Sequence, residues 1–585
     1  MASVSTTDFK TRLMLLLVLI SVLIMALTAE AAPPHPRLLE QTAAGKAARP
    51  FFMKNMNDLR GAGINSGTNV FEDELGVSKS PATGVTAVSG EFNVLAILVQ
   101  FTDEPAATSA SYFDNMLFDA SNISVRHYYR DASFGQLDIV TVNLPSSQGW
   151  RMAPQTYSYY VNGESGVNPD SYPRNSQGLV EDLVSLIDPV IDFSAYDNNN
   201  NDFVDVLMVI HAGQGAEVTG SDDDMWSHQW NIYPQATNDG VYVSRFTIQP
   251  EYLHSPGDMT IGVFVHELGH AFGVPDLYDT DYSSNGIGAW GVMAYGSWLG
   301  PHGDGGMPSL PSAWSRIKLG FGRSIVVSTN TNQQAIEDVK DGGDIFRVWT
   351  AGRLGDEYFL VENRQKSGYD TYIPASGLFV WHIDEDMTSN DHEWYPGLNP
   401  SSHYLVALEQ SDGLFELELA VDGGDAGDIL PIGNDAFNTN SPTTSDSYTL
   451  GPSLVAIENI SSPAPLMYAD FRVALAGSID GEPGGIIGED VLPDRLTLLQ
   501  NYPNPFNPAT TISFYSPEPG FASVNIINML GYRVRTLFEG TVDAGVTETV
   551  WDGTNSSGNT VASGIYLYQV NVNGQKKVKK MVLVR

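Results

Sequence analysis

Residues 266–276 place two histidines and two acids at spacings that suit metal-assisted chemistry. His266 and His270 stand four residues apart, so on a helix both imidazoles face the same side and can reach one metal ion. Glu267 follows the first histidine and would lie beside that ion, where it can take a proton from a metal-bound water. The pattern predicts a catalytic metal site. The alternative is a buried helix whose histidines are hydrogen-bonded core residues.

A third protein ligand requires the chain to turn back after the second histidine. Gly273 is expected to end the helix, because glycine accepts the left-handed conformation of the turn that follows. That turn brings Asp276 to the position where a third ligand is needed. Three protein ligands leave a fourth position open, which is typical of catalytic rather than structural Zn²⁺ sites.

The elements around this motif must hold it in a core. A turn at residues 256–258 precedes the helix, and we expect Asp258 to cap the first free amides. Continuous apolar runs at 94–101 and 204–211 predict buried strands. The helix also carries the apolar stripe of a core-facing helix, formed by Ile261, Phe264, Val265, Leu268 and Phe272.

A turn around Met293 completes a set of features that resembles a known family. The His-Glu-x-x-His-x-x-Gly-x-x-Asp motif, residues 277–280 and this turn look like the immune inhibitor A family of secreted bacterial metallopeptidases. These enzymes are metzincin-like zinc peptidases. The likeness runs over residues 90–470, so it covers most of the chain.

The resemblance implies hydrolysis of extracellular proteins or peptides. Zn²⁺ would be held by His266, His270 and Asp276, and Glu267 would act as general base toward a zinc-activated water. Tyr295 departs from many relatives, which carry a small residue there. In astacin- and serralysin-type enzymes, a tyrosine at such a turn can bind zinc or the oxyanion. The alternative is that Tyr295 only packs.

Composition narrows the function further. The chain has 585 residues, which predicts several domains, and a formal net charge of −39. That charge argues against nucleic acid and anionic membrane surfaces as partners, because both would repel it. The absence of cysteine excludes disulfides, a lipid-modified cysteine anchor and a thiolate that could cap the metal in a latent form.

The order of segments predicts an exported, multidomain protein. Two basic residues precede an apolar run at 13–27, which is short for a membrane anchor, and Ala29-Glu30-Ala31 offers a cleavage site. The fold class is an α/β (α+β) metzincin-like peptidase domain followed by a β-sandwich and a C-terminal Ig-like β-sandwich. The expected segments are a signal peptide 1–31, a propeptide 32–88, a catalytic domain 89–325, a β-sandwich 326–474, a linker 475–492 and an Ig-like domain 493–585.

The propeptide is expected to cover the active site until it is removed, and a disordered leader is the alternative. No transmembrane anchor is expected in the mature chain, which would be secreted or held at the cell surface. The prediction that residues 32–88 cover the active site rests on their mixed composition and on their position before the catalytic domain.

An acidic loop before the second strand offers oxygen ligands at alternating positions. Asp197, Asn199, Asn201 and Asp205 are the candidates for Ca²⁺, which prefers six to eight hard oxygens. The alternative is a solvated Asn/Asp turn. Farther along, three strand-end residues could suggest a second metal, but hydrogen bonding is the favoured interpretation of Glu362, His382 and Asp384.

The C-terminal module resembles the sorting domain that is read by the type IX secretion system, and the similar flagellar-hook-cap Ig-like module. The likeness rests on the phrase at 501–508, on Trp551-Asp552-Gly553 and on the basic ending at 576–585. It implies secretion machinery as a partner. The alternative is a cap strand with a solvated basic face.

Two other functions remain open. One is a non-catalytic surface adhesin built from β modules that keeps its metal only for stability. The other is a metallohydrolase that acts on a non-peptide bond. The intact Glu267 favours an enzyme over the adhesin, because a purely structural metal site does not need that acid.

Overall fold

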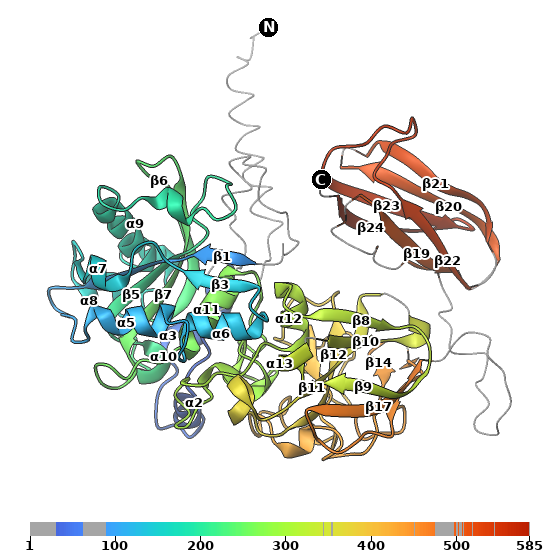
Figure 1. Cartoon of the computed structure of the whole chain (residues 1–585), viewed down its shortest axis with the longest axis horizontal. Helices are drawn as coiled ribbons and strands as arrows, with labels where there is room; N and C mark the ends of the chain where they lie inside the picture. Colours follow the sequence, from blue (N-terminus) through green and yellow to red (C-terminus); the bar gives the residue numbers. More distant parts are fainter. Residues whose placement is uncertain are drawn as a thin grey trace, which may run out of the picture.

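The computed structural model describes residues 31–61, 89–473 and 496–583, except 343, 353, 354, 450, 499, 500, 502–505, 507, 517, 518, 530, 543 and 544. Residues 1–30 of the expected signal peptide, 62–88 of the expected propeptide and the expected linker lie outside these ranges. Figure 1 shows a mixed α/β unit followed in the chain by two β units. The expectation of a multidomain α/β protein is therefore confirmed.

The first unit is built on a five-stranded sheet of order β4-β2-β5-β7-β6, in which only β6 runs antiparallel to its neighbour. Ile97 of β2 packs into the core on one face and Leu98 into the core on the other. Because both faces are covered, the strand reads as one apolar run. The strands are β1 (Gly90–Asn93), β2 (Leu95–Gln100), β3 (Leu137–Val140), β4 (Arg151–Met152), β5 (Leu207–Gln214), β6 (His228–Ala236) and β7 (Tyr242–Tyr252).

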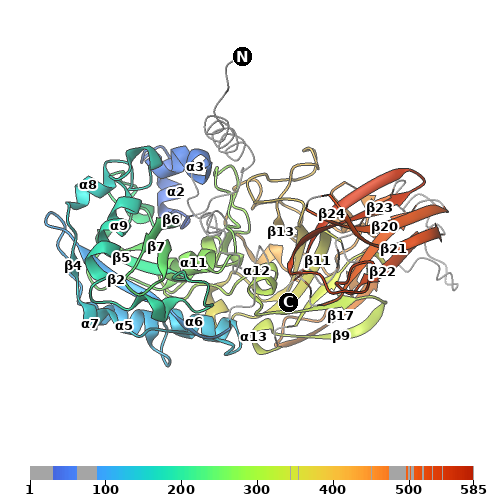
Figure 2. The ribbon, with the colours of Figure 1, turned by 90° about the horizontal axis from the view of Figure 1, so that it is seen from above.

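Helices cover both faces of this sheet. The helices α5, α6, α11 and α12 pack on one face, and α8 and α9 pack on the other together with the N-terminal α2 and α3. Seen from above, α2 and α3 lie over the end of the sheet that carries β6 (Figure 2). The bounds are α2 (Pro36–Ala43), α3 (Phe51–Gly61), α5 (Ala110–Phe118), α6 (Val125–Ala132), α7 (Pro145–Gln148), α8 (Tyr157–Val161), α9 (Ser176–Ile187), α10 (Ala216–Thr219), α11 (Gly262–Ala271) and α12 (Ala313–Leu319).

Two local predictions were wrong. Strand β5 begins at Leu207 rather than at 204, because the acidic loop continues through Asp205, whose carboxylate accepts hydrogen bonds from Asn198. Asp258 does not cap α11, which begins at Gly262 without a side-chain cap. It lies one turn too early, and its carboxylate accepts from the amides of residues 253–255 to close the preceding turn.

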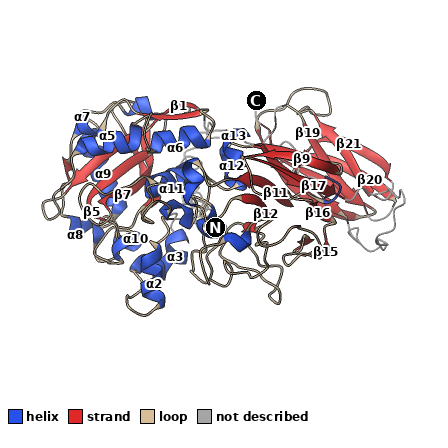
Figure 3. Cartoon of the chain, turned by 60° about the horizontal axis from the view of Figure 1, so that its bottom comes forward, coloured by secondary structure: helices blue, strands red, loops and turns tan. Residues whose placement is uncertain are grey.

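The second unit is a two-layer β structure (Figure 3). One sheet has the order β13-β12-β11-β10-β8 and the other β16-β17-β9, with a hydrophobic core between them. Its elements are β8 (Arg323–Val327), β9 (Thr331–Glu337), α13 (Val339–Gly342), β10 (Asp344–Val348), β11 (Glu357–Arg364), β12 (Gly377–Asp384), β13 (Val406–Leu408), β14 (Asp446–Ser447), β15 (Gly451–Pro452), β16 (Val455–Glu458) and β17 (Leu466–Val473).

The five-stranded sheet of this unit is buried on both faces. On β12, Leu378 and Val380 point into the core between the two sheets. Phe379 and Trp381 point the other way, into the same cluster that contains helix α11 of the first unit. The two units therefore share one hydrophobic core.

The strand-end polar residues of this unit are used for hydrogen bonding. Trp381 donates its indole N–H to Glu362 at 2.9 Å, and Asp384 lies 2.9 Å from His403. His382 lies between two carboxylates, at 3.0 Å from Glu357 and 2.8 Å from Glu409. Burial alone would lower the pKa of His382, but these two partners outweigh it and raise the pKa to about 9.

We expect the chain to lose stability as the pH rises toward 9. The folded-state pKa of His382 lies above the ordinary value of 6.5, so its contribution is complete below pH 6.5 and is lost as the pH rises through about 9. The shift corresponds to a few kcal/mol, about 1.4 for each unit. Denaturant midpoints measured from pH 6 to 10 check this. The His382→Gln variant should show a flatter profile, unlike the exposed-site control His302→Gln, and parallel profiles would contradict the assignment.

The third unit is a small sandwich of a three-stranded sheet, β18-β19-β22, and a four-stranded sheet, β21-β20-β23-β24, packed around Trp551. The lysines of β24 line the exposed half of an edge strand, and Lys579 forms an ion pair with Asp356 of the second unit. The strands are β18 (Thr497–Leu498), β19 (Thr510–Ser516), β20 (Gly520–Asn528), β21 (Arg533–Val542), β22 (Gly545–Trp551), β23 (Gly564–Val572) and β24 (Gln575–Leu583). Within the described ranges, no helix has the length and apolar character needed to cross a bilayer.

Candidate metal centre

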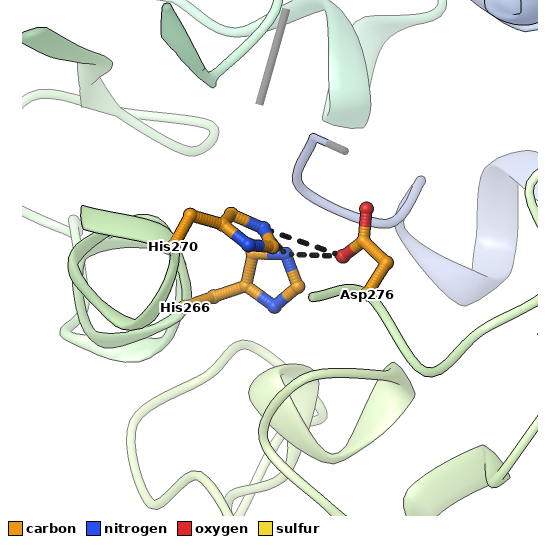
Figure 4. Close-up of side chains that lie close together, drawn as sticks. All are labelled: His266, His270 and Asp276. Atoms are coloured by element: carbon orange, nitrogen blue, oxygen red, sulfur yellow. Dashed lines mark hydrogen bonds and ion pairs between the residues drawn. The ribbon is translucent and has the colours of Figure 1, made fainter. Parts of the chain in front are cut away.

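The structure brings the three residues proposed as ligands to one buried point. Helix α11 presents His266 and His270 on the same face, and Gly273, at φ +90°, turns the chain back toward them. The Nε2 atoms of the two imidazoles are 3.0 Å apart. Asp276 places Oδ1 at 3.0 Å from His266 Nε2 and 3.4 Å from His270 Nε2 (Figure 4). The three side chains are almost completely buried.

Backbone carbonyls fix the tautomers of both histidines. His266 Nδ1 lies 2.8 Å from the carbonyl oxygen of Val292, and His270 Nδ1 lies 2.9 Å from that of Val274. A carbonyl oxygen can only accept, so both Nδ1 atoms carry the hydrogen. In the neutral rings, two Nε2 lone pairs and one carboxylate oxygen then converge on one point. Such a donor set repels itself unless a cation lies between its members, and its two nitrogens and one oxygen suit Zn²⁺.

Glu267 lies beside these ligands without a hydrogen-bond partner of its own. Both of its carboxylate oxygens are buried and unpaired, as is Oδ1 of Asp276. Burial raises the pKa of Glu267 well above its usual value, and the nearby charge of Asp276 raises it further. An unpaired buried carboxylate is costly in a purely structural site, so these orphaned oxygens also fit a bound cation.

The turn around Met293 packs against the helix that carries the two histidines and against the chain that follows Asp276. Its carbonyl oxygen accepts from the amide of Leu277 at 2.8 Å, which holds the chain just after Asp276. Met293 Sδ packs against Gly269, where an added Cβ would approach it to 2.7 Å. The glycine between the two histidines is therefore needed for close packing, a requirement that only the fold reveals.

Tyr295 lies in the short helix Tyr295–Trp298 that follows this turn. It is buried, and its ring centre is 5.9 Å from that of Tyr278. Its side chain lines a cavity of about 280 Å³ between α2 and residues 282–285. Its place in the fold is therefore next to the metal centre, on the side that faces α2.

The N-terminal segment 31–35 lies beside the metal centre, where a covering propeptide was expected, but sequence reasoning did not identify the residues that bind it. The amide of Ala31 donates to Asp276 Oδ2 at 2.9 Å, and the blue ribbon of this segment passes beside Asp276 in Figure 4. Ala31 pairs antiparallel with His228 at the start of β6. The indoles of Trp226 and Trp298 donate to the carbonyls of Ala32 and Pro33 at 3.0 and 2.9 Å.

The acidic loop 197–205 closes on itself through hydrogen bonds. The carboxylate of Asp197 accepts from the amides of residues 201 and 202, at 3.0 and 2.9 Å. Asn199 directs its side-chain nitrogen, not its oxygen, to Asp205 at 2.7 Å. Asn201 Oδ1 accepts from the amide of Phe203 at 3.0 Å. Ca²⁺ binding there stays a prediction.

Comparisons with known proteins point to the same region. Residues 90–322 match the family model described as immune inhibitor A peptidase M6, catalytic domain, and residues 507–576 match the FlgD Ig-like domain. Pre-pro-metalloprotease PrtV of Vibrio cholerae serotype O1 is 29% identical over 273 residues, which are 38% of this chain and 29% of the relative. Immune inhibitor A of Bacillus thuringiensis subsp. alesti is 30% identical over 254 residues, which are 35% of this chain and 36% of the relative.

Among solved structures, FlgD from P. aeruginosa matches 13% of this chain and 59% of its own, with 24% identity and a TM-score of 0.11. The chain spans only 29% of the length of PrtV and 36% of the length of immune inhibitor A, the two curated relatives. The family matches confirm the resemblance to immune inhibitor A peptidases over residues 90–322 and that to the flagellar-hook-cap Ig-like module over residues 507–576. The likeness expected over 323–470 and the one to a type IX sorting domain stay predictions.

Proposed function

We propose that this chain is a secreted zinc endopeptidase that hydrolyses peptide bonds of extracellular proteins. The observation that supports this best is the convergence of three metal-ligand atoms beside an unpartnered carboxylate, inside a peptidase M6 domain. Zn²⁺ in such a site polarises a carbonyl and lowers the pKa of a bound water to about 7. The metzincin-like assignment of the domain is part of this proposal.

Each residue then has a role of its own. His266, His270 and Asp276 hold the ion. Glu267 takes the proton of the attacking water, whose oxygen adds to the carbonyl carbon of the substrate. The C–N bond then breaks, and the same proton passes from Glu267 to the leaving amine.

The N-terminal segment supports latency by steric cover. Residues 31–35 are buried across the metal centre, and α2 and α3 pack beside them. A peptide substrate would need the same place, so we infer that the chain becomes active once this cover has been removed. With no cysteine in the sequence, the cover cannot act through a thiolate.

Export is the second part of the proposal. The apolar N-terminal run would direct the chain out of the cytoplasm, and secretion machinery would recognise the C-terminal module. The exposed lysines of β24 give that module a basic edge in a chain whose net charge is −39. Because the net charge is strongly negative, we do not expect nucleic acid as a partner.

Metal removal tests the proposed activity. Isolated protein from which residues up to 88 have been processed away should carry one zinc ion per chain and digest casein. Chelation should abolish digestion, and added Zn²⁺ should restore it. A zinc-loaded, processed chain that digests no protein would favour the adhesin alternative or a non-peptide substrate.

The Asp276→Ala variant tests the third ligand in the same experiment. We expect zinc content to fall well below one per chain, because only two imidazoles remain to hold the ion. The Asp205→Ala variant is the matched control, since it removes a half-buried loop carboxylate that is not part of the His266, His270 and Asp276 group. Zinc content that stayed at one per chain in Asp276→Ala would mean that another residue is the third ligand.

A further inference from the structure

We propose that the hydroxyl of Tyr278 is the hydrogen-bond donor that holds the scissile carbonyl of a peptide substrate and the oxyanion formed from it. This assignment deepens the proposed function and rests on it. It replaces Tyr295, the residue that the sequence suggests for this contact. The observation behind it is the contact that the site makes with Ala31, the last residue of the expected signal peptide, whose carbonyl is still bonded to Ala32 in this chain and stands in for that of a substrate.

The peptide bond between Ala31 and Ala32 lies beside the third ligand of the metal centre. Tyr278 donates its hydroxyl hydrogen to the carbonyl oxygen of Ala31. The next amide, that of Ala32, donates to the carbonyl of Ser227 at 3.4 Å and lies near the carboxylate of Glu267. A peptide carbonyl next to the ligands thus already has a side-chain donor, as an oxyanion formed there would need.

Neighbouring contacts hold the bound segment through its backbone. The amide of Ala31 donates at 2.9 Å to Asp276 Oδ2, the oxygen of this carboxylate that does not face the imidazoles. Trp226 and Trp298 bind the next two carbonyls. Because these contacts use main-chain atoms, a substrate of different sequence can make them as well.

Tyr278 is held rigidly, as a pre-organised donor must be. It is completely buried, and its ring packs 6.4 Å from that of His266 and 6.3 Å from that of Tyr282. The preceding residue, Leu277, donates to the carbonyl of Met293 and accepts from the side chain of Asn390 at 3.0 Å. The ring is therefore held by contacts other than the one with Ala31.

Tyr295 occupies a different place. Its ring lies 5.9 Å from that of Tyr278, and its side chain lines the cavity beside α2 rather than the Ala31 carbonyl. The two tyrosines are both buried and both close to the ligands. They form a matched pair in which only one touches the bound peptide bond.

The experiment compares Tyr278→Phe with Tyr295→Phe in the processed, zinc-loaded protein. We expect Tyr278→Phe to lower kcat by about 10²–10³-fold with KM changed by less than about threefold, the pattern for a lost oxyanion donor. Tyr295→Phe should stay within about fivefold of the parent, a bound set by the small cost of a packing change. Equal losses in both variants, or full activity in Tyr278→Phe, would overturn the assignment.

Two further measurements separate this role from a structural one. Zinc content and thermal midpoint should match the parent in both variants. Affinity for a phosphinic peptide, whose tetrahedral P–O⁻ resembles the oxyanion, should fall in Tyr278→Phe by a factor similar to that in kcat. If the parent protein binds zinc but cleaves no peptide, the proposed function fails, and phosphinic-peptide affinity alone then decides the role of Tyr278.

Discussion

Replacing Glu267 by Gln should lower peptide hydrolysis by about 10²–10⁴-fold while the protein keeps one zinc ion, because the amide cannot take the proton of the attacking water. The substitution keeps the size of the side chain and removes only its basicity. No described side chain donates to the Glu267 carboxylate, so the exchange disturbs no hydrogen bond in this structure. Zinc analysis and single-substrate kinetics on the two proteins provide the measurement.

Glu217→Gln is the matched control for this change. Glu217 is also completely buried, but it accepts hydrogen bonds from the hydroxyl and amide of Ser227 at 2.8 and 3.2 Å. These bonds go to different oxygens, so a glutamine keeps one of them, and because Glu217 is not one of the grouped ligands, hydrolysis should remain within a few-fold of the parent. Hydrolysis that survives in Glu267→Gln would show that another group is the base.

Replacing Arg364 by Met should destabilise the protein by about 3–5 kcal/mol, because the change leaves a buried carboxylate without its cation. Arg364 is completely buried and forms two bonds to Asp370, at 2.6 and 2.9 Å. It also donates to the carbonyls of Trp290 and Leu310. Both carbonyls belong to the segments that flank the Met293 turn, so the loss should reach the metal centre.

Arg323→Met shows how much of this effect comes from burial. Arg323 makes the same two-pronged contact with Asp344, at 2.8 Å for both bonds, but its side chain is 72% exposed. Its removal should cost about 0–1 kcal/mol, as expected for a surface pair. Denaturant titrations of the two variants give both values. Equal losses would mean that burial of the Arg364 pair adds nothing.

The ligand residues could be predicted because their geometry is local. Two histidines four apart lie on one face of any helix, and a glycine turn three residues later returns Asp276 to them. The residues that bind the N-terminal segment could not, because each contact joins distant parts of the chain. Tyr278 meets a residue 247 positions away, and Trp298 meets one 265 positions away. No local pattern marks such pairs.

The fold, too, could be predicted where the pattern is local and not where distant segments meet. Strand β2 was predictable because a strand in which every side chain is apolar is buried only where both faces of its sheet are covered. Asp258 was assigned to a cap because an aspartate before a helix has two common uses, and only the start of α11 at Gly262 decides between them. The pairing of Phe379 and Trp381 with the core of the first unit depends on how sheets pack, which strand alternation alone does not tell.

The shared core has a consequence for how this protein can be rearranged. Asn285 and Ala289, between the third ligand and Met293, donate to carbonyls of the second unit at 2.9 and 2.8 Å, and Trp290 donates to Asp428 at 3.0 Å. Residue 322, where the family match ends, is therefore not a boundary between two independent folding units. In any chimera or recombination between relatives, we therefore expect that the stretch from 89 to 473 must be inherited whole.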